Sequence, residues 1–218
     1  MTIQLSAFKS IPDFARGQVR DLRVRWALEE AGIPYTTKLL GQGEQKSEPY
    51  VTDWQPFGQV PAIHEDGLHM FESGAIVLHI GETSDVLLPK DPAGRARATQ
   101  WLLCALNTME VVIQQYASIN IFFANEEWAK LRKPSLEEQM KGRLHALSKA
   151  LGSKDWLDAR FTAGDLLMIT VLRILNGTNF LDATPNLVAY KKRGEARSAF
   201  QRALNAQIAD IEGTRSAA

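Results

Sequence analysis

The sequence is poor in cysteine, because Cys104 is the only one among 218 residues. A single thiol cannot form an internal disulfide, and it excludes a cysteine-rich metal site. The four histidines show no spacing typical of a metal site, so we expect no bound metal. A chain without disulfides suits a reducing compartment, and we therefore expect a cytoplasmic protein.

Net charge and long apolar runs are also lacking. The 25 basic side chains balance the 25 acidic ones, so bulk electrostatics does not draw the chain to nucleic acid or to an anionic membrane. No run approaches the roughly 18 apolar residues that cross a bilayer. Residues 1–10 contain no basic stretch followed by an apolar core, so we expect no signal peptide. We expect neither nucleic acid nor a membrane as a partner.

What the sequence does contain is the pattern of a globular protein, with 45% hydrophobic residues. The first part reads as strands and helices together. A helical pattern opens within 16–21 and ends at Gly32, a turn occupies Glu65–Gly67, and Ser73 is expected to cap a helix that ends near Gly81. Alternating apolar residues predict a strand at 3–8, and we expect three further strands at 35–40, 60–64 and 68–71. The strand–helix–strand unit predicts a parallel pair and the hairpin an antiparallel one, hence a mixed sheet.

The second part of the chain shows no convincing strand. Two prolines between Leu87 and Pro92 mark a linker. Helical spacing follows over four segments, at 95–123, 136–151, 166–175 and from 187 onward. Thr162 and Asp165 form a capping box ahead of the third segment, which we interpret as structural. The sequence therefore predicts an α/β domain at 1–85, a linker at 86–91 and an all-helical domain at 92–218.

Two short segments in the first domain carry possible chemistry. Pro61 cannot donate to a strand ladder, so it belongs at an edge or a bend. If the Val60–Pro61 bond is cis, the backbone of Val60 faces outward and an extended peptide could pair with it. A trans edge-strand proline is the alternative, because only about 5–6% of such bonds are cis.

The second segment is Glu72–Ser73. The Ser73 hydroxyl and the free N–H groups at a helix start form a carboxylate site, and Glu72 could accept hydrogen bonds from an ammonium group. Together they suit an α-amino-acid head group, although Ser73 could equally be only a helix cap. Cys104 lies in an apolar helix near Trp101, where we expect a buried, inert thiol.

Together these residues form a known pattern. Gln55–Ile63 (QPFGQVPAI) followed by Phe71–Ile76 (FESGAI) closely resembles the glutathione-site signature of cytosolic glutathione transferases. Gly43–Pro49 looks like the loop before that signature in the phi class and related bacterial enzymes, and Phe161–Asp165 looks like the capping motif of the family's helical domain. The resemblance runs over roughly 3–200. It implies a thioredoxin-like first domain and a C-terminal helical bundle.

The resemblance also implies that glutathione is the co-substrate. Pro61 would be a cis proline, and Val60 would pair with the cysteinyl backbone of glutathione. Glu72 and Ser73 would hold its γ-glutamyl head group, in agreement with the amino-acid site argued above.

Three polar residues would meet the other end of the tripeptide. By resemblance, Gln59 and Lys46, with Gln45, would contact its polar or glycyl part. Members of the family are commonly homodimers, and we expect the same here.

The sequence departs from the family between the first strand and the first helix. There the family places a Tyr, Ser or Cys that stabilises the glutathione thiolate. The segment 11–18 looks longer than usual and places Gln18 or a neighbour at that position, while Ser10 is the hydroxyl close by. Backbone N–H groups at the helix start, with Arg16 or Arg20, could instead lower the pKa of the thiol. We take Ser10 and Arg16 as the candidate catalytic residues.

The resemblance implies a detoxifying glutathione transferase that acts on a small hydrophobic or electrophilic second substrate. Conjugation and the reduction of a disulfide or peroxide are both open. The alternative is a non-catalytic glutathione-binding or regulatory protein on the same fold, which the atypical segment 11–18 favours. A redox protein that uses its own cysteine is disfavoured, because the first domain has none.

Overall fold

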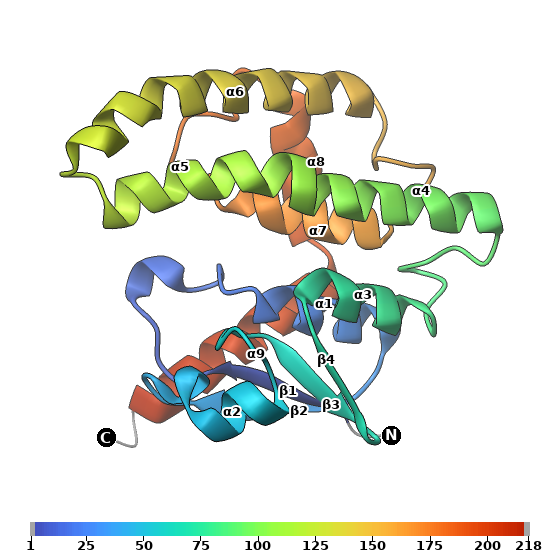
Figure 1. The fold of residues 1–218 in the computed structure, drawn as a ribbon. Coiled ribbons are helices and arrows are strands. Elements are labelled where there is room, and N and C mark those ends of the chain that lie inside the picture. Colours follow the sequence, from blue (N-terminus) through green and yellow to red (C-terminus); the bar gives the residue numbers. More distant parts are fainter. Residues whose placement is uncertain (1–2, 216–218) are drawn as a thin grey trace. The chain divides into compact units, whose positions relative to one another are not determined.

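The computed structural model describes residues 3–215, and these divide into two compact units (Figure 1). The described residues up to Leu88 and those from Ala196 form the first unit, and Pro89–Glu195 form the second. Helix α9 (Ser198–Arg215) packs against α1 (Asp21–Ala31) within the first unit. The predicted domain boundaries, with a linker at 86–91, stay a prediction.

The first unit contains a four-stranded mixed sheet in the order β2-β1-β3-β4, which confirms the predicted fold class. Strands β1 and β2 are parallel, and β3 is antiparallel to both β1 and β4. The strands are β1 (Ile3–Phe8), β2 (Tyr35–Leu40), β3 (Ala62–Glu65) and β4 (Leu68–Phe71). Asp66 and Gly67 join the hairpin with φ values of 45° and 86°, the backbone that favours a two-residue turn. Strand β3 begins two residues later than predicted.

The helices of the first unit agree with the prediction for α1 and differ from it in the loop that follows β2. Helix α1 begins at Asp21, at the C-terminal end of the range 16–21 in which it was predicted to open, and a short 3₁₀ helix, η1 (Asp13–Ala15), and Gly17 with φ 69° precede it. Its end at Gly32, with φ 68°, is as predicted. A 3₁₀ helix, η2 (Glu44–Lys46), and helix α2 (Glu48–Asp53) were missed, because such short helices show no periodicity.

Apolar and charged contacts together join α1 to α9. Trp26 is completely buried, and its ring meets that of Phe200 edge-on at 4.9 Å between centroids. Arg25, also buried, donates to Asp21 at 2.8 Å and to Asp210 at 2.7 Å. Buried ion pairs of this kind fix how two helices pack, because leaving either charge unpaired is costly.

The second unit contains helices and connecting loops, with no strand over residues 89–195. Its helices are α4 (Pro92–Leu103), a π-helix η3 (Cys104–Glu110), α5 (Val111–Phe122), α6 (Glu127–Leu151), α7 (Ala163–Arg173) and α8 (Pro185–Glu195). Figure 1 shows α4 and α5 as one continuous coil, with η3 forming the middle of it. Every residue of α7 is buried, so this helix forms the centre of the unit.

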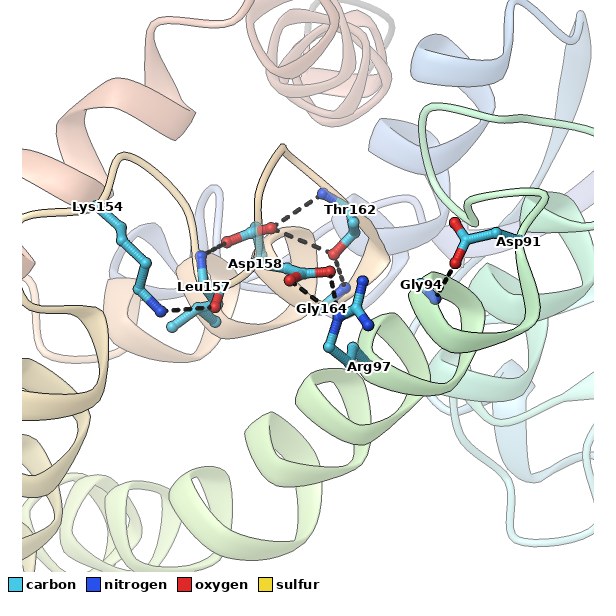
Figure 2. Close-up of polar contacts among 9 residues, drawn as sticks. Asp91, Gly94, Arg97, Lys154, Leu157, Asp158, Thr162 and Gly164 are labelled. Atoms are coloured by element: carbon cyan, nitrogen blue, oxygen red, sulfur yellow. Dashed lines mark hydrogen bonds and ion pairs between the residues drawn. The ribbon is translucent and has the colours of Figure 1, made fainter.

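The start of α7 is tied down by the predicted capping box. The Asp165 carboxylate accepts hydrogen bonds from the N–H groups of Thr162 and Leu157, both at 2.9 Å, and from the Tyr190 hydroxyl at 2.9 Å. Burial raises the pKa of Asp165. Figure 2 shows the hydrogen bonds at Thr162 and Leu157 beside the Arg97–Asp158 ion pair, whose atoms lie 2.9 Å apart. They all connect residues of the helical unit, as a structural role requires.

Candidate functional site

The signature segment ahead of β3 is held by a buried side chain at its start. Gln55 is 2% exposed, and its side-chain oxygen accepts hydrogen bonds from the N–H of Phe57 at 2.7 Å and of Gln59 at 3.1 Å. The Gly58 N–H adds a turn hydrogen bond to the Gln55 carbonyl at 3.0 Å. The loop therefore has one defined shape. The peptide bond between Val60 and Pro61 is cis, as the resemblance implied.

Two buried hydroxyl groups hold the other end of the segment. The Tyr50 hydroxyl donates to the carbonyl of Gln59 at 2.7 Å and lies 2.8 Å from Ser6 Oγ. Ser6 Oγ in turn accepts from the Ala62 N–H at 2.8 Å. Val60 lies between these anchored residues and outside β3, which begins at Ala62. This leaves its backbone at the place where a peptide ligand is expected to pair.

The residues predicted to meet the glycyl end lie next to this loop. Gly58 has a φ of 63°, and a Cβ atom there would be 2.8 Å from the Gln45 carbonyl oxygen and 3.3 Å from Lys46 Cγ. The close approach brings Gln45 and Lys46 beside the residue that precedes Gln59. Lys46 is exposed, whereas the side-chain oxygen of Gln45 is buried without a hydrogen-bond partner in the described structure. An unpaired buried acceptor is costly, so a donor at this point would stabilise it.

The head-group segment begins α3 (Ser73–Gly81), but its cap differs from the prediction. Glu72, not Ser73, is the N-cap residue, with φ 71° and ψ 108°, and Ser73 is the first helical residue. The prediction that Ser73 caps the helix was therefore wrong. The Ser73 side chain is free of the cap role because Glu72 already holds the non-helical backbone conformation. The exposed Glu72 and the buried Ser73 stand at the positive end of the α3 dipole.

A residue that sequence reasoning did not assign completes this corner. Arg23 on α1 is 4% exposed, and its NH1 group donates to Ser73 Oγ at 3.3 Å. A guanidinium only donates hydrogen bonds, so Ser73 accepts and its own hydrogen stays available for a carboxylate. In the sequence, Arg23 stands out only as an arginine in the first turns of the predicted helix. Periodicity alone does not show that its side chain faces Ser73.

The two candidate catalytic residues precede α1. Ser10 is exposed and lies two residues after the end of β1. Arg16 lies 3.4 Å from the Asp13 carboxylate and donates to Glu212 at 3.3 Å. Two carboxylates therefore offset the charge that Arg16 could offer to a thiolate, and Arg20 is the exposed N-cap of α1.

Cys104 and the residue types that bind metals do not form part of this site. The thiol of Cys104 is half-buried rather than buried as expected, and burial raises its pKa. Between residues 3 and 215, no three His, Cys, Asp or Glu side chains gather as a metal site would require. None of the helices in this range combines the length and the apolarity needed to cross a bilayer.

Comparison with known proteins defines the class to which this fold and site belong. Residues 14–82 match the family model of the glutathione S-transferase N-terminal domain. A glutathione S-transferase of Hyoscyamus muticus is 30% identical over 205 residues, which span 84% of this chain and 92% of that protein. The chain belongs to the glutathione S-transferase family.

Solved bacterial structures show the same architecture. A glutathione transferase family member from Pseudomonas fluorescens, with two glutathione molecules bound, has a TM-score of 0.80 and 25% identity, over 93% of this chain and 92% of that one. A glutathione transferase from Burkholderia graminis, with two glutathione molecules per subunit, has a TM-score of 0.80 and 25% identity, over 94% and 88% of the two chains.

Proposed function

We propose that this protein binds glutathione and joins it, through its thiolate sulfur, to an electrophilic substrate. The observation that carries the proposal is the corner formed by Arg23, Ser73 and Glu72. It combines a buried cation, an oriented hydroxyl and a helix N-terminus with an exposed carboxylate. These groups complement the carboxylate and the ammonium of a γ-glutamyl head group.

The rest of glutathione follows from this anchor. Its cysteinyl backbone pairs with Val60, which adds the peptide alongside the sheet. The glycyl carboxylate then meets Gln59, Gln45 and Lys46, where Lys46 supplies a positive charge and the half-buried Gln45 lies beside the Gly58 turn.

The thiolate needs a group that lowers the thiol pKa. Ser10 and Arg16 stay the candidates, together with the backbone N–H groups that precede α1. The ion pairs of Arg16 favour Ser10, because its hydroxyl is exposed while the charge of Arg16 is partly compensated.

Conjugation is the reaction proposed first. The glutathione sulfur forms a bond to an electrophilic carbon, and a leaving group such as halide departs with the bonding electron pair.

Reduction of a disulfide is a second candidate, supported by the relatives that hold two glutathione molecules. There, the first glutathione thiolate attacks the disulfide, forms a mixed disulfide and releases one substrate thiol. A second glutathione thiolate then attacks the mixed disulfide, releases the second substrate thiol and forms glutathione disulfide. With a hydroperoxide, the first thiolate attacks the outer peroxide oxygen, which cleaves the O–O bond, releases the alcohol and leaves a glutathione sulfenic acid. A second glutathione then condenses with the sulfenic acid to form glutathione disulfide and water.

Isothermal titration with glutathione tests binding, and turnover with an aryl halide, a disulfide and an alkyl hydroperoxide tests chemistry. We expect binding at micromolar to millimolar glutathione and turnover in at least one assay that falls in Ser10→Ala. Absence of binding at millimolar glutathione would refute the proposal. Binding with no turnover in any assay would favour the alternative, a non-catalytic or regulatory glutathione-binding protein.

We further propose that the protein is a cytoplasmic homodimer. Phe57 and Phe71 in the first unit are 70% and 37% exposed, and their rings meet edge-on at 6.2 Å between centroids. An exposed aromatic pair of this kind suits a subunit contact. Sedimentation velocity checks this: we expect a dimer for the wild type and a shift toward monomer in Phe57→Ser.

A further inference from the structure

A chain of hydrogen bonds crosses the interior of the first unit and ends on the two sides of Val60. The Tyr50 hydroxyl donates to the Gln59 carbonyl at 2.7 Å, so its oxygen is left to accept from Ser6 at 2.8 Å. Ser6 Oγ accepts from the Ala62 N–H at 2.8 Å. Ser6 Oγ also lies 3.2 Å from the Ala62 carbonyl oxygen, a second acceptor for its hydrogen. The two hydroxyl groups therefore connect Ala62 to the Gln59 carbonyl.

Water cannot easily take the place of these hydrogen bonds, because the two hydroxyl groups are buried. Ser6 is completely buried and Tyr50 is 3% exposed. Burial raises the pKa of the Tyr50 hydroxyl, so it stays protonated and remains a donor. The Tyr50 ring stacks on Trp54 at 6.1 Å and belongs to an apolar cluster that includes Val60 and Ala62. The hydroxyl can thus be removed without removing the ring that packs the loop.

The chain also decides which backbone groups a ligand can reach. The Gln59 carbonyl is bound by Tyr50, and the Gln59 N–H is bound by Gln55. A peptide that approaches this loop therefore finds both backbone groups of Gln59 already bound by buried side chains. Val60 is the next residue along the chain. The buried Tyr50 and Gln55 side chains therefore restrict the register in which a peptide can pair with the loop.

We propose that Tyr50, acting with Ser6, is a positioning residue for glutathione: the two hydroxyl groups hold Gln59 and Ala62 so that Val60 presents its backbone to the cysteinyl part of the ligand. This inference rests on the proposed function, because it concerns the glutathione site. Neither hydroxyl touches glutathione in it, so the role differs from that of Glu72 or Ser73.

The test measures the dissociation constant for glutathione by isothermal titration in the wild type, Tyr50→Phe, Ser6→Ala and the double variant. We expect Tyr50→Phe to weaken binding about three- to tenfold, the range of one buried hydrogen bond. Ser6→Ala should weaken it comparably. The double variant should lose little more than either single one, since both remove the same chain. Where turnover is measurable, the KM for glutathione should rise while that for the second substrate stays unchanged.

The matched control is Tyr190→Phe. Tyr190 is a buried tyrosine whose hydroxyl donates to Asp165 at 2.9 Å in the helical unit, so this variant loses a comparable hydrogen bond away from the site. It should lower the thermal midpoint and leave the dissociation constant for glutathione at the wild-type value. A merely structural role for Tyr50 predicts the same pattern for Tyr50→Phe.

The outcomes separate the two proposals. If the wild type binds glutathione and Tyr50→Phe and Ser6→Ala bind equally well, the positioning role is overturned and the proposed function stands. If the wild type does not bind glutathione at millimolar concentration, the proposed function fails and the inference falls with it. Should Tyr50→Phe fail to fold, Ser6→Ala is tested instead. We expect this variant to bind glutathione more weakly and to show faster hydrogen exchange at the Ala62 amide. If Ser6→Ala binds glutathione as the wild type does and exchange at Ala62 is unchanged, the positioning role is overturned.

Discussion

Arg23 donates a hydrogen bond from its guanidinium to the hydroxyl oxygen of Ser73 at 3.3 Å, and both side chains are buried. The contact connects α1 to the first residue of α3. It orients the hydroxyl and places a positive charge behind the proposed γ-glutamyl site. In this chain the residue after Ser73 is Gly74, which adds no side chain of its own. The positive charge at this corner therefore comes from Arg23 on α1.

Arg23→Met should weaken glutathione binding about tenfold or more, because a charge-assisted hydrogen bond and a nearby cation are lost. Arg23→Lys should lose less, since the charge is retained. Isothermal titration on variants with native circular dichroism measures this. Arg202→Gln is the matched control, because Arg202 pairs with Glu29 at 2.6 Å in the same unit. Wild-type affinity in folded Arg23→Met would contradict the assignment.

A substitution at Gly58 should have two effects, one on stability through its left-handed backbone and one on glutathione binding through its contact with Gln45. Gly58→Ala should destabilise the protein by about 1 kcal/mol or more through its positive φ, and it should also weaken glutathione binding, because the new Cβ would meet the Gln45 carbonyl at 2.8 Å. Gly67→Ala is the control: its φ is 86° and nothing lies within 4 Å of its Cβ position. It should show the backbone cost alone. Denaturant unfolding and glutathione titration measure the two effects, and equal binding by both variants would argue against a role for the Gln45–Gly58 contact.

Much of the fold could be predicted because its signals are local. Alternating apolar residues mark β1, and Asp66–Gly67 supply the positive φ that the hairpin turn needs. Helix α2 could not be found in this way, because six residues give less than two turns of periodicity. The start of α1 could be predicted only to within 16–21, because Gly17 and the preceding 3₁₀ turn lie where the helical pattern opens in the sequence.

The site shows the same division. The Val60–Pro61 and Glu72–Ser73 segments could be found because their residues are adjacent in the chain. The partners that support them lie far away: Ser6 is 56 residues from Ala62 and Arg23 is 50 residues from Ser73. No periodicity connects such pairs. Only the packing of α1, α2 and β1 brings their hydroxyl and guanidinium groups to the loop.

Cys104 should react slowly with thiol reagents at neutral pH. Burial raises the pKa of its thiol, while Thr108 and Arg143 lower it less, so the thiolate fraction at a given pH is smaller than for an ordinary cysteine. The rate of alkylation by iodoacetamide should therefore fall below that of free glutathione at pH 8 and rise steadily toward higher pH. Mass spectrometry follows the single adduct, with Cys104→Ser as the blank. A rate at pH 7 above that of glutathione would show an activated thiol instead.

The helical unit depends on one close approach between α4 and α7. A Cβ atom on Gly164 would lie 2.5 Å from Trp101 Cβ and 3.1 Å from the Ala98 carbonyl oxygen. Gly164→Ala should therefore cost about 1–3 kcal/mol in the free energy of unfolding, as overpacking does. Gly142→Ala, in α6, meets nothing within 4 Å and should instead stabilise by about 0.5–1 kcal/mol, because alanine favours the helix. Thermal and urea unfolding of the two variants measure both signs. A stabilised Gly164→Ala would mean that α4 and α7 are not packed as closely as the structure shows.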